Sequence, residues 1–348
     1  MPVARARQGK SRDSFDRKVR AKNLLGYWMI PTRSDGYREP TPDYGAHLWH
    51  WDDIRAILEE AVGQVPKEEA HRRFIGYQHP DLKMGTSPNL MLGAQMLVPG
   101  EEAPCHRHTM DAVRFVIQGN GSTSTVVEGE AFPMARGDLI TTPNWSWHDH
   151  VSSGEETTIW LDGAVAPLIV RFGIGFAEPH QAPQQSVTRP RGWSRRQFGP
   201  MRAKHRDVSA TAYRPPYHYP WAETRAALDM LAGGAGDPFD AVSVVFADPE
   251  TGGPTLPTVG CEVMMLRAGE ATKSHRHTHA VIYHAFEGAG TTVIEGERYR
   301  WAEGDTFVVP CWAWHAHENE GMEPAILFSI NDDPVMRALG FEREEQAG

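Results

Sequence analysis

The residues whose types and spacing point most clearly to chemistry are six of the seventeen histidines. They form two sets, each with a His-x-His pair followed about forty residues later by a third histidine. The sets are His106, His108 and His148, and His275, His277 and His315. Three neutral imidazoles suit a divalent metal that keeps coordination positions open. A lone histidine is more often a packed or surface residue, but a duplicated set at matched distance favours metal binding.

Short β-strands must position these histidines. On a strand, residues i and i+2 point to the same face, so His106 and His108 project together, and His148 has to arrive from a later strand. The segments RFVIQG, TSTVVEG and DLITTP are rich in β-branched and aromatic residues, and each ends at glycine or proline. Many short strands at this spacing predict a sandwich or a barrel.

The region around the first triad is repeated later in the chain. Residues 100–150 align with residues 269–317, with an offset of 169 at His106 and His275 and of 167 from Glu128 and Glu295 onward. A two-residue deletion explains the change of offset. Too many special residues align for chance, so the sequence predicts a duplicated domain.

The repeat predicts four segments. Residues 1–22 form a flexible basic segment, 23–177 the N-terminal copy with a helical lead-in, 178–235 a connecting segment, and 236–348 the C-terminal copy. The lead-in helix follows from the helical apolar period of WDDIRAILEEAVGQV, and a second helix is expected at WAETRAALDMLA. The Pro- and Arg-rich stretch before the second helix is interpreted as a linker, and an ordered arm wrapping its neighbour is the alternative.

The composition excludes several classes of protein. With 35 basic and 45 acidic residues the net charge is −10, which disfavours a nucleic-acid binder. No apolar run approaches the ~18 residues of a membrane span, and the first residues contain no apolar stretch typical of a secretory signal. The three cysteines lack CxxC spacing and predict neither a disulfide framework nor a cysteine metal site. A soluble cytoplasmic protein is expected.

Glycine, proline and tryptophan accompany the histidines at fixed intervals. Gly100-x5-His106-x-His108 and Gly137-x5-Pro143-x-Trp145-x2-His148 resemble the two motifs of the cupin superfamily, and both recur around the second triad. The resemblance implies an all-β-dominated bicupin, two tandem cupin β-barrels with flanking N-terminal and inter-domain helices. A glutamate that often follows the His-x-His pair as a fourth ligand is absent from the first copy.

Longer segments narrow the resemblance. HRHTMDAVRFVIQG, GDLITTPNWSWHDH, IWLDG, HLWHWDD and EEAHRRF resemble the gentisate 1,2-dioxygenase and salicylate 1,2-dioxygenase family, from about Trp28 to Phe341. The resemblance implies an Fe(II)-dependent, extradiol-type oxidoreductase of aromatic catabolism that inserts O2 between C1 and C2 of a hydroxybenzoate. The substrate carries an ortho carboxylate and hydroxyl, as in gentisate, salicylate, or 5-nitro- and 5-chlorosalicylate. A 1-hydroxy-2-naphthoate dioxygenase and a non-catalytic ligand-binding bicupin remain alternatives.

The same resemblance implies the roles of single residues. His106, His108 and His148 hold one Fe(II) per chain, Arg114 contacts the substrate carboxylate, and His150 acts near the substrate hydroxyl and O2. One of Arg72 and Arg73 also faces the substrate, and Arg73 is favoured. The remaining substrate contacts are Gln95, Gly93, Met91, Asp162 and Trp147.

Departures from the family pattern concern substrate choice and the second copy. Met91 stands where the family often has an aromatic residue, and Ala164-Val165 where it has Leu-Asp, so the ring substituent stays open. The position matching Arg114 in the second copy is Tyr283, which removes the cation that would bind a carboxylate. The second copy is therefore predicted to be non-catalytic, with its histidines either ligands or barrel filler. The family resemblance also implies a homotetramer, with a small aromatic acid as substrate and no nucleic-acid or membrane partner.

Overall fold

The computed structural model describes residues 12–30, 39–66, 72–200 and 214–347, and it divides the chain into two compact units, residues 1–41 and 42–348. In the first unit residues 12–20 are helical, followed by the 3-10 helix η1 (Tyr27–Met29). The Trp28 indole donates to the Asp16 carboxylate over 3.0 Å, and its ring stacks on Phe15. Residues 12–20 of the segment expected to be flexible are thus helical, and these contacts join the helix to the chain that follows it. Residues 1–11 lie outside the described residues.

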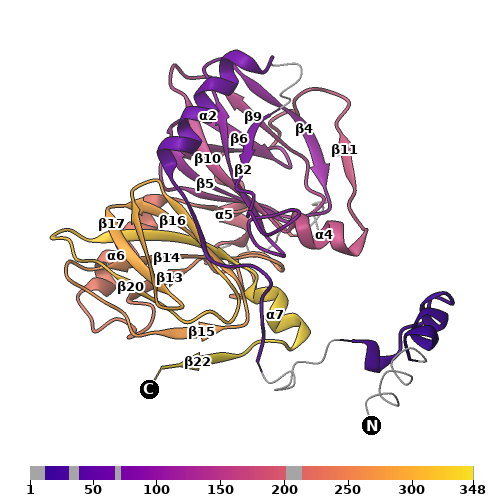
Figure 1. The fold of residues 1–348 in the computed structure, drawn as a ribbon. Helices are drawn as coiled ribbons and strands as arrows, with labels where there is room; N and C mark the ends of the chain where they lie inside the picture. Colours follow the sequence, from indigo (N-terminus) through magenta and orange to yellow (C-terminus); the bar gives the residue numbers. More distant parts are fainter. Residues whose placement is uncertain (1–11, 31–38, 67–71, 201–213, 348) are drawn as a thin grey trace, which may run out of the picture. The chain divides into compact units, whose positions relative to one another are not determined.

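The second unit contains two copies of one β-rich domain (Figure 1). The N-terminal copy comprises β2 (Arg73–Gly76), β3 (Met91–Leu97), β4 (Glu102–His108), β5 (Ala112–Gln118), β6 (Asn120–Val127), β7 (Glu130–Ala135), β8 (Leu139–Thr142), β9 (His148–Ser152), β10 (Thr158–Ala164) and β11 (Ala177–Pro179). The C-terminal copy comprises β13 (Val242–Val245), β14 (Gly260–Leu266), β15 (His275–His277), β16 (Val281–Glu287), β17 (Ala289–Ile294), β18 (Glu297–Ala302), β19 (Thr306–Val309), β20 (His315–Glu318), β21 (Ala325–Asn331) and β22 (Glu344–Gln346). The helices of this unit are α2 (Trp51–Gln64), α4 (Ala166–Phe172), α5 (Trp193–Phe198), α6 (Trp221–Ala232) and α7 (Asp333–Leu339).

Each copy pairs a six-stranded sheet with a five-stranded sheet. The six-stranded sheets have the orders β12-β8-β5-β10-β3-β2 and β1-β19-β16-β21-β14-β13, where β12 is His218–Tyr219 and β1 is His47–Trp49. The five-stranded sheets have the orders β11-β4-β9-β6-β7 and β18-β17-β20-β15-β22. The predicted bicupin with flanking helices is confirmed. Among the described residues no helix has both the length and the apolar character that crossing a membrane requires.

The two copies exchange short strands. Strand β1 (His47–Trp49) precedes the N-terminal copy but pairs with β19 of the C-terminal copy. Strand β12 (His218–Tyr219) precedes the C-terminal copy but pairs with β8 of the N-terminal copy. Each added strand covers a sheet edge that would otherwise leave backbone groups unpaired. The residues expected to belong only to the lead-in and to the connecting segment therefore complete the opposite sheets.

A buried aspartate anchors each exchanged segment. Asp305 accepts hydrogen bonds from the Trp51 amide at 2.9 Å and from His50 at 3.2 Å, at the start of α2. Asp138 accepts from the Trp221 amide at 2.9 Å and from a histidine of β12 at 2.8 Å, at the start of α6. The carboxylates also complement the positive ends of the helix dipoles.

We expect the variants Asp138→Ala and Asp305→Ala each to lose about 2 kcal/mol of unfolding free energy, because hydrogen bonds to charged groups are the stronger ones. Urea unfolding followed by tryptophan fluorescence measures the change. Glu320→Ala, whose side chain is 78% exposed, is the control and should unfold at the wild-type midpoint. Wild-type midpoints for both aspartate variants would show that these anchors do not stabilise the exchange.

The six-stranded sheets pack against each other through apolar side chains. Phe115 of the N-terminal copy stacks on Phe328 of the C-terminal copy, with ring centroids 3.9 Å apart and planes 2° apart. Phe286 meets the same Phe115 ring edge-on at 4.9 Å. A single cluster of buried residues, including Val113, joins the two copies. Because these outer faces form the shared core, the opposite face of each sheet is left to line its own barrel.

The described part of the connecting segment is ordered. Strand β11 pairs with β4, which carries the first two histidines. The Gln185 side chain donates to the carbonyls of Val126 and Trp147 and accepts from the Gly129 amide at 2.7 Å. Residues 178–200 thus form an arm along the N-terminal copy, which is the alternative that the sequence left open, and residues 201–213 lie outside the described residues.

Candidate active site

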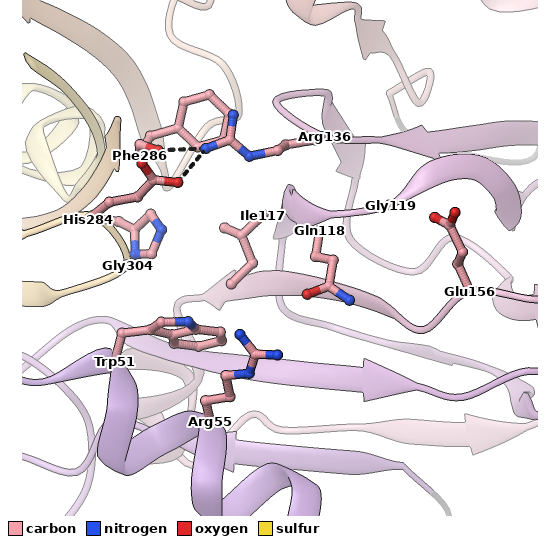
Figure 2. A pocket seen from close by; sticks show the side chains of 11 residues that line it. Trp51, Arg55, Ile117, Gln118, Gly119, Arg136, Glu156, His284, Phe286 and Gly304 are labelled. Atoms are coloured by element: carbon pink, nitrogen blue, oxygen red, sulfur yellow. Dashed lines mark hydrogen bonds and ion pairs between the residues drawn. The ribbon is translucent and has the colours of Figure 1, made fainter. Parts of the chain in front are cut away.

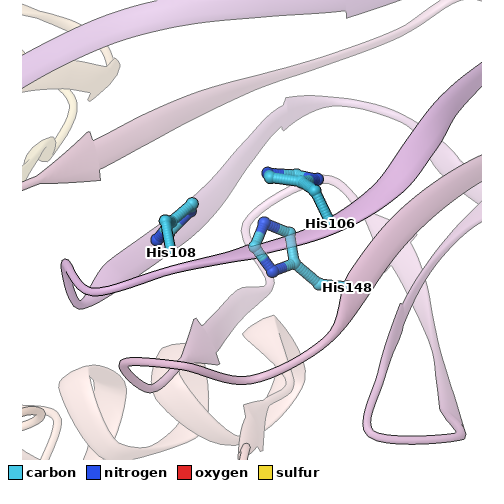
Figure 3. A group of neighbouring side chains, drawn as sticks. All are labelled: His106, His108 and His148. Carbon is cyan, nitrogen blue, oxygen red and sulfur yellow. The ribbon is translucent and has the colours of Figure 1, made fainter. Parts of the chain in front are cut away.

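The first triad converges inside the N-terminal barrel. Strand β4 carries His106 and His108, and the register of β4 with β9 sets His106 opposite His148. The ring centroid of His148 lies 4.1 Å from that of His106 and 4.8 Å from that of His108 (Figure 3). One ligand nitrogen from each ring lies within 4.8 Å of the others. The three imidazole nitrogens are therefore close enough together to hold a single metal ion.

Backbone carbonyls fix the tautomer of all three rings. The Nδ1 atoms of His106, His108 and His148 lie 2.9–3.0 Å from a carbonyl oxygen two residues away. A carbonyl oxygen only accepts, so each Nδ1 carries the proton and each Nε2 keeps its lone pair. This arrangement orients histidines for metal ligation.

The electrostatic environment keeps these rings neutral. Burial, with the nearby Arg72, lowers the pKa of His106 to about 2. Burial, with Arg114, lowers the pKa of His108 to about 4 and that of His148 well below its usual value. Neutral imidazole is the form that binds a metal.

The loop that delivers His148 is tied to the strand of the other ligands. Trp145 adopts a left-handed backbone conformation with φ 60°, and its amide donates to the His108 carbonyl over 2.7 Å. The second copy repeats this geometry at Trp312, which has φ 61° and whose backbone amide donates a hydrogen bond to the His277 carbonyl over 2.6 Å. The Pro-x-Trp-x2-His pattern therefore encodes a turn that holds the third ligand beside the first two.

Three adjacent strands carry a row of three residues that faces the triad, two of which are charged; we call it the charged row. The register places Asp162 of β10 between Gly93 of β3 and Arg114 of β5, so the three positions share one face. The Arg114 guanidinium is 1% exposed and donates to the Thr142 hydroxyl. Burial lowers the pKa of Arg114, and Asp162 opposes this. A guanidinium group is basic enough to stay charged in proteins.

Further predicted substrate contacts lie on the same face. Gln95 is opposite Trp160, and Met91 is opposite Ala164, each two residues from the charged row. His150 lies two residues after the third ligand, and its ring centroid is 4.8 Å from that of Trp160. Burial lowers the pKa of His150 well below its usual value. The structure thus brings the predicted Gln95, Met91 and His150 to the barrel that holds the triad.

Several buried polar atoms of this barrel lack a hydrogen-bond partner among the described residues. They are Gln95 Nε2, Arg114 Nε, His148 Nε2, His150 Nδ1 and Trp160 Nε1. Buried polar groups in native proteins are almost always satisfied, and exceptions cluster at binding sites. Their concentration around one triad indicates a binding site for polar ligands.

The arginine that faces the triad is Arg72 and not the favoured Arg73. The Arg72 guanidinium contacts the His106 ring, and burial lowers its pKa to about 10. Arg73 points to the opposite side and forms an ion pair with Glu101. Because side chains alternate along β2, only one of two consecutive arginines can face the barrel.

Trp147, also predicted to contact substrate, lies outside the barrel. It precedes an inward-facing ligand, so it points out of the barrel, where Arg107 lies 4.4 Å over its ring and His180 packs at 4.8 Å. The structure therefore does not bring Trp147 together with the triad. Its indole instead packs against the strand that carries the His-x-His pair and the arm that follows β11.

One pocket residue was missed by sequence reasoning. Phe74 lies opposite Gln95, hence on the inward face of β2, and its ring covers Gly93. A Cβ atom on Gly93 would come 2.4 Å from the Phe74 Cζ atom, so the glycine is needed to admit this ring. The alternation of side chains along a strand could have identified Phe74, because it places Arg72 and Phe74 on the same face.

A separate pocket lies between the two copies and contains none of these residues. Its wall includes Trp51, Gln118, Arg136 and His284 (Figure 2). The Arg136 guanidinium is already engaged, donating to the Phe286 carbonyl at 2.8 Å and to Glu303 at 3.0 Å. The Arg136 cation is thus committed to contacts that join the two copies.

The fold and the triads define a bicupin, and the family model described as "Cupin domain" matches residues 93–163 and 262–331. The chain is 39% identical to a 5-aminosalicylate 1,2-dioxygenase of Comamonas sp., over 88% of this chain and 83% of that protein. It is 35% identical to a 1-hydroxy-2-naphthoate 1,2-dioxygenase of Nocardioides sp., over 98% of this chain and 89% of that protein. The crystal structure of salicylate 1,2-dioxygenase from Pseudoaminobacter salicylatoxidans with gentisate superposes with a TM-score of 0.85 at 29% identity, covering 97% of this chain and 94% of that one.

The chain belongs to the gentisate and salicylate 1,2-dioxygenase family of ring-cleaving bicupin oxidoreductases. The predicted family and enzyme class are confirmed.

Proposed function

We propose that the N-terminal barrel performs Fe(II)-dependent ring cleavage between C1 and C2 of a benzoate with an ortho hydroxyl. The observation that carries this proposal is the convergence of three Nε2 lone pairs and two guanidinium groups in one barrel. The metal would bind the three Nε2 atoms, of which that of His148 is buried without a hydrogen-bond partner among the described residues, and the cations would bind the carboxylate.

The residues present fit iron. His106, His108 and His148 are neutral donors, and the His148 Nε2 atom is buried without a hydrogen-bond partner among the described residues. Three protein ligands leave coordination positions for a chelating substrate and O2. When bound, Fe(II) supplies Lewis acidity and a route for electrons between ring and oxygen. We propose one catalytic Fe(II) per chain.

Arg114 and Arg72 bind and orient the substrate carboxylate. Arg114 is buried and Arg72 is half-buried, and Asp162 offsets only one of the two positive charges. A charge-assisted guanidinium–carboxylate pair fixes the plane of the acid as well as its position. Holding the reactants in one geometry lowers the activation free energy by roughly 7 kcal/mol or more.

His150 holds or moves a proton at the substrate hydroxyl. It points to the same side as His148 and its Nδ1 atom is buried without a partner among the described residues. A neutral imidazole offers one donor and one acceptor, so it takes the hydroxyl proton as the substrate binds and returns it later.

The pocket wall around Met91 and Ala164 sets the ring substituent. Methionine is flexible and polarisable, and alanine leaves space beside it on the neighbouring strand. We propose that the enzyme accepts salicylates with different groups at C5. The names of its relatives support this range, and 1-hydroxy-2-naphthoate, which has the same chelating groups on a wider ring system, is the second candidate.

An oxygen-uptake screen tests the proposal. With the iron-loaded enzyme we expect turnover of at least one salicylate lacking the 5-hydroxyl, tested alongside gentisate and 1-hydroxy-2-naphthoate. The positional isomers 3- and 4-hydroxybenzoate are the controls and should not be cleaved, since they cannot chelate. A strict requirement for gentisate would contradict the role given to Met91 and Ala164. Absence of uptake with every substrate would contradict ring cleavage.

We also propose that the enzyme acts in aromatic catabolism in the cytoplasm as a homotetramer. The support for an assembly is a run of apolar side chains, 49–65% exposed, that follows α4 and its end: Val170, Phe172, Ile174 and Phe176. Clustered exposed apolar groups are typical of protein interfaces.

A further inference from the structure

The C-terminal barrel repeats the triad in a more enclosed form. His275 lies opposite His315 in the register of β15 with β20, and the ligand nitrogens of the three histidines lie within 4.8 Å. The exposed fractions of His275, His277 and His315 are 3%, 6% and 1%. Such burial of three imidazoles requires partners for their nitrogens.

Two of these rings already present a lone pair to the centre. The Nδ1 atoms of His277 and His315 donate to carbonyl oxygens at 2.9 and 3.0 Å, which leaves both Nε2 atoms as acceptors. The Nε2 atom of His275 is 2.9 Å from that of His315. On its other side, the buried His275 Nδ1 atom has no hydrogen-bond partner among the described residues and lies 3.8 Å from Glu344.

This geometry leaves few neutral arrangements for His275. If its Nε2 carries the proton, its Nδ1 lone pair faces the Glu344 carboxylate, which is repulsive. If its Nδ1 carries the proton and faces Glu344, two Nε2 lone pairs oppose each other at 2.9 Å. A cation among the three Nε2 atoms removes that repulsion, and a carboxylate behind a ligating histidine is a common metal-site arrangement.

The surroundings of this triad have the opposite charge from those of the first. In the row that matches Gly93, Asp162 and Arg114, the C-terminal barrel has Glu262, Ser329 and Tyr283. In the N-terminal barrel Arg72 contacts His106, the first histidine of its triad. In the C-terminal barrel the corresponding histidine, His275, instead has Asp240 3.9 Å from its Nε2 atom. Both arginines are thus replaced, and carboxylates of Asp240, Glu262 and Glu344 approach the site instead.

We propose that the C-terminal barrel is a second, closed metal site, in which His275, His277, His315 and the Asp240 carboxylate bind a divalent cation such as Zn(II). A fourth protein ligand is the mark of structural sites, whereas catalytic sites keep a position open. The acidic surroundings attract a cation and repel an arylcarboxylate. The site ties the turn containing Asp240 and the terminal strand β22, which carries Glu344, to the barrel. The proposal does not depend on the reaction of the other barrel.

Cobalt(II) is the probe for this site. In His106→Ala the first triad is broken, so the chelator-treated variant should still bind one equivalent of Co(II), with the intense visible absorption of a four-coordinate site. Its thermal midpoint should rise as Co(II) is added, because a ligand of the folded state stabilises it. In the same background His277→Ala should abolish binding, and Asp240→Asn should weaken it roughly tenfold or more. Asp229→Asn, which changes a 54% exposed carboxylate on α6, is the matched control and should bind as tightly as its parent.

Two results overturn the proposal. A folded His106→Ala variant that binds no Co(II) excludes the site. Unchanged affinity and absorption after Asp240→Asn exclude the closed coordination. If His106→Ala does not fold, His148→Gln isolates the same site. Since bound metal and thermal midpoint are the readouts, failure here is distinct from failure of ring cleavage, which oxygen uptake by the wild-type enzyme measures.

Discussion

The variant His106→Ala should lose ring cleavage and one equivalent of bound metal together. His106 supplies one of only three nitrogens in the first triad, and two imidazoles cannot hold a catalytic metal against competing water. Changes to groups that merely support metal ligands already cost 10- to 100-fold, so we expect activity to fall by at least about 100-fold. Oxygen uptake and metal content per chain measure the two losses.

The control for this variant is His50→Ala. It removes an imidazole that is 61% exposed and pairs with Asp305, outside both triads. This protein should retain wild-type metal content and turnover at temperatures well below its unfolding transition. Normal turnover by His106→Ala would remove His106 from the ligand set and contradict the catalytic assignment of the N-terminal barrel.

The variant Arg114→Ala should keep its metal and lose substrate recognition. The buried Arg114 cation is expected to form a charge-assisted pair with the carboxylate, worth about 1.5–3 kcal/mol, which corresponds to a roughly 10- to 150-fold lower kcat/KM. Steady-state oxygen uptake over a range of salicylate concentrations measures the change. Metal content should stay at the wild-type level, because Arg114 lies on β5 and no ligand does.

Two further substitutions separate recognition from packing. Arg114→Met keeps most of the buried volume without the charge, and it should be as impaired as Arg114→Ala if the charge matters. Arg55→Ala, which removes a 53% exposed cation paired with Glu59 on α2, should be unaffected. An unchanged kcat/KM in both Arg114 variants would assign the side chain a structural role with Asp162 and Thr142.

The duplicated barrels explain how one chain holds two triads with different environments. Both copies keep the His-x-His pair and the Pro-x-Trp-x2-His turn, because these determine the geometry of the strands and the loop. The facing row differs, with Arg114 and Asp162 in one copy and Tyr283 and Ser329 in the other. The same scaffold therefore presents an arginine beside one triad and a tyrosine at the matching position beside the other.

The features that depend on short-range spacing could be predicted from the amino-acid sequence. The period of two in a strand is enough to group His106 with His108 on one face. The repeated intervals from glycine to histidine and from proline to histidine are enough to predict the duplication and the third ligand of each set. These patterns reflect local backbone geometry, which a few neighbouring residues specify.

Which face of each strand lines the barrel, and which segments meet across it, depend on tertiary contacts. Alternation along a strand places Arg72 and Phe74 on one face, and it places Trp147 on the face opposite to His148. It does not say which of the two faces points inward, because that depends on where the sheets close. The exchange of β1 and β12 and the approach of Asp240 to His275 likewise join residues far apart in the chain. Such contacts arise from the burial of a shared core, and no local pattern encodes them.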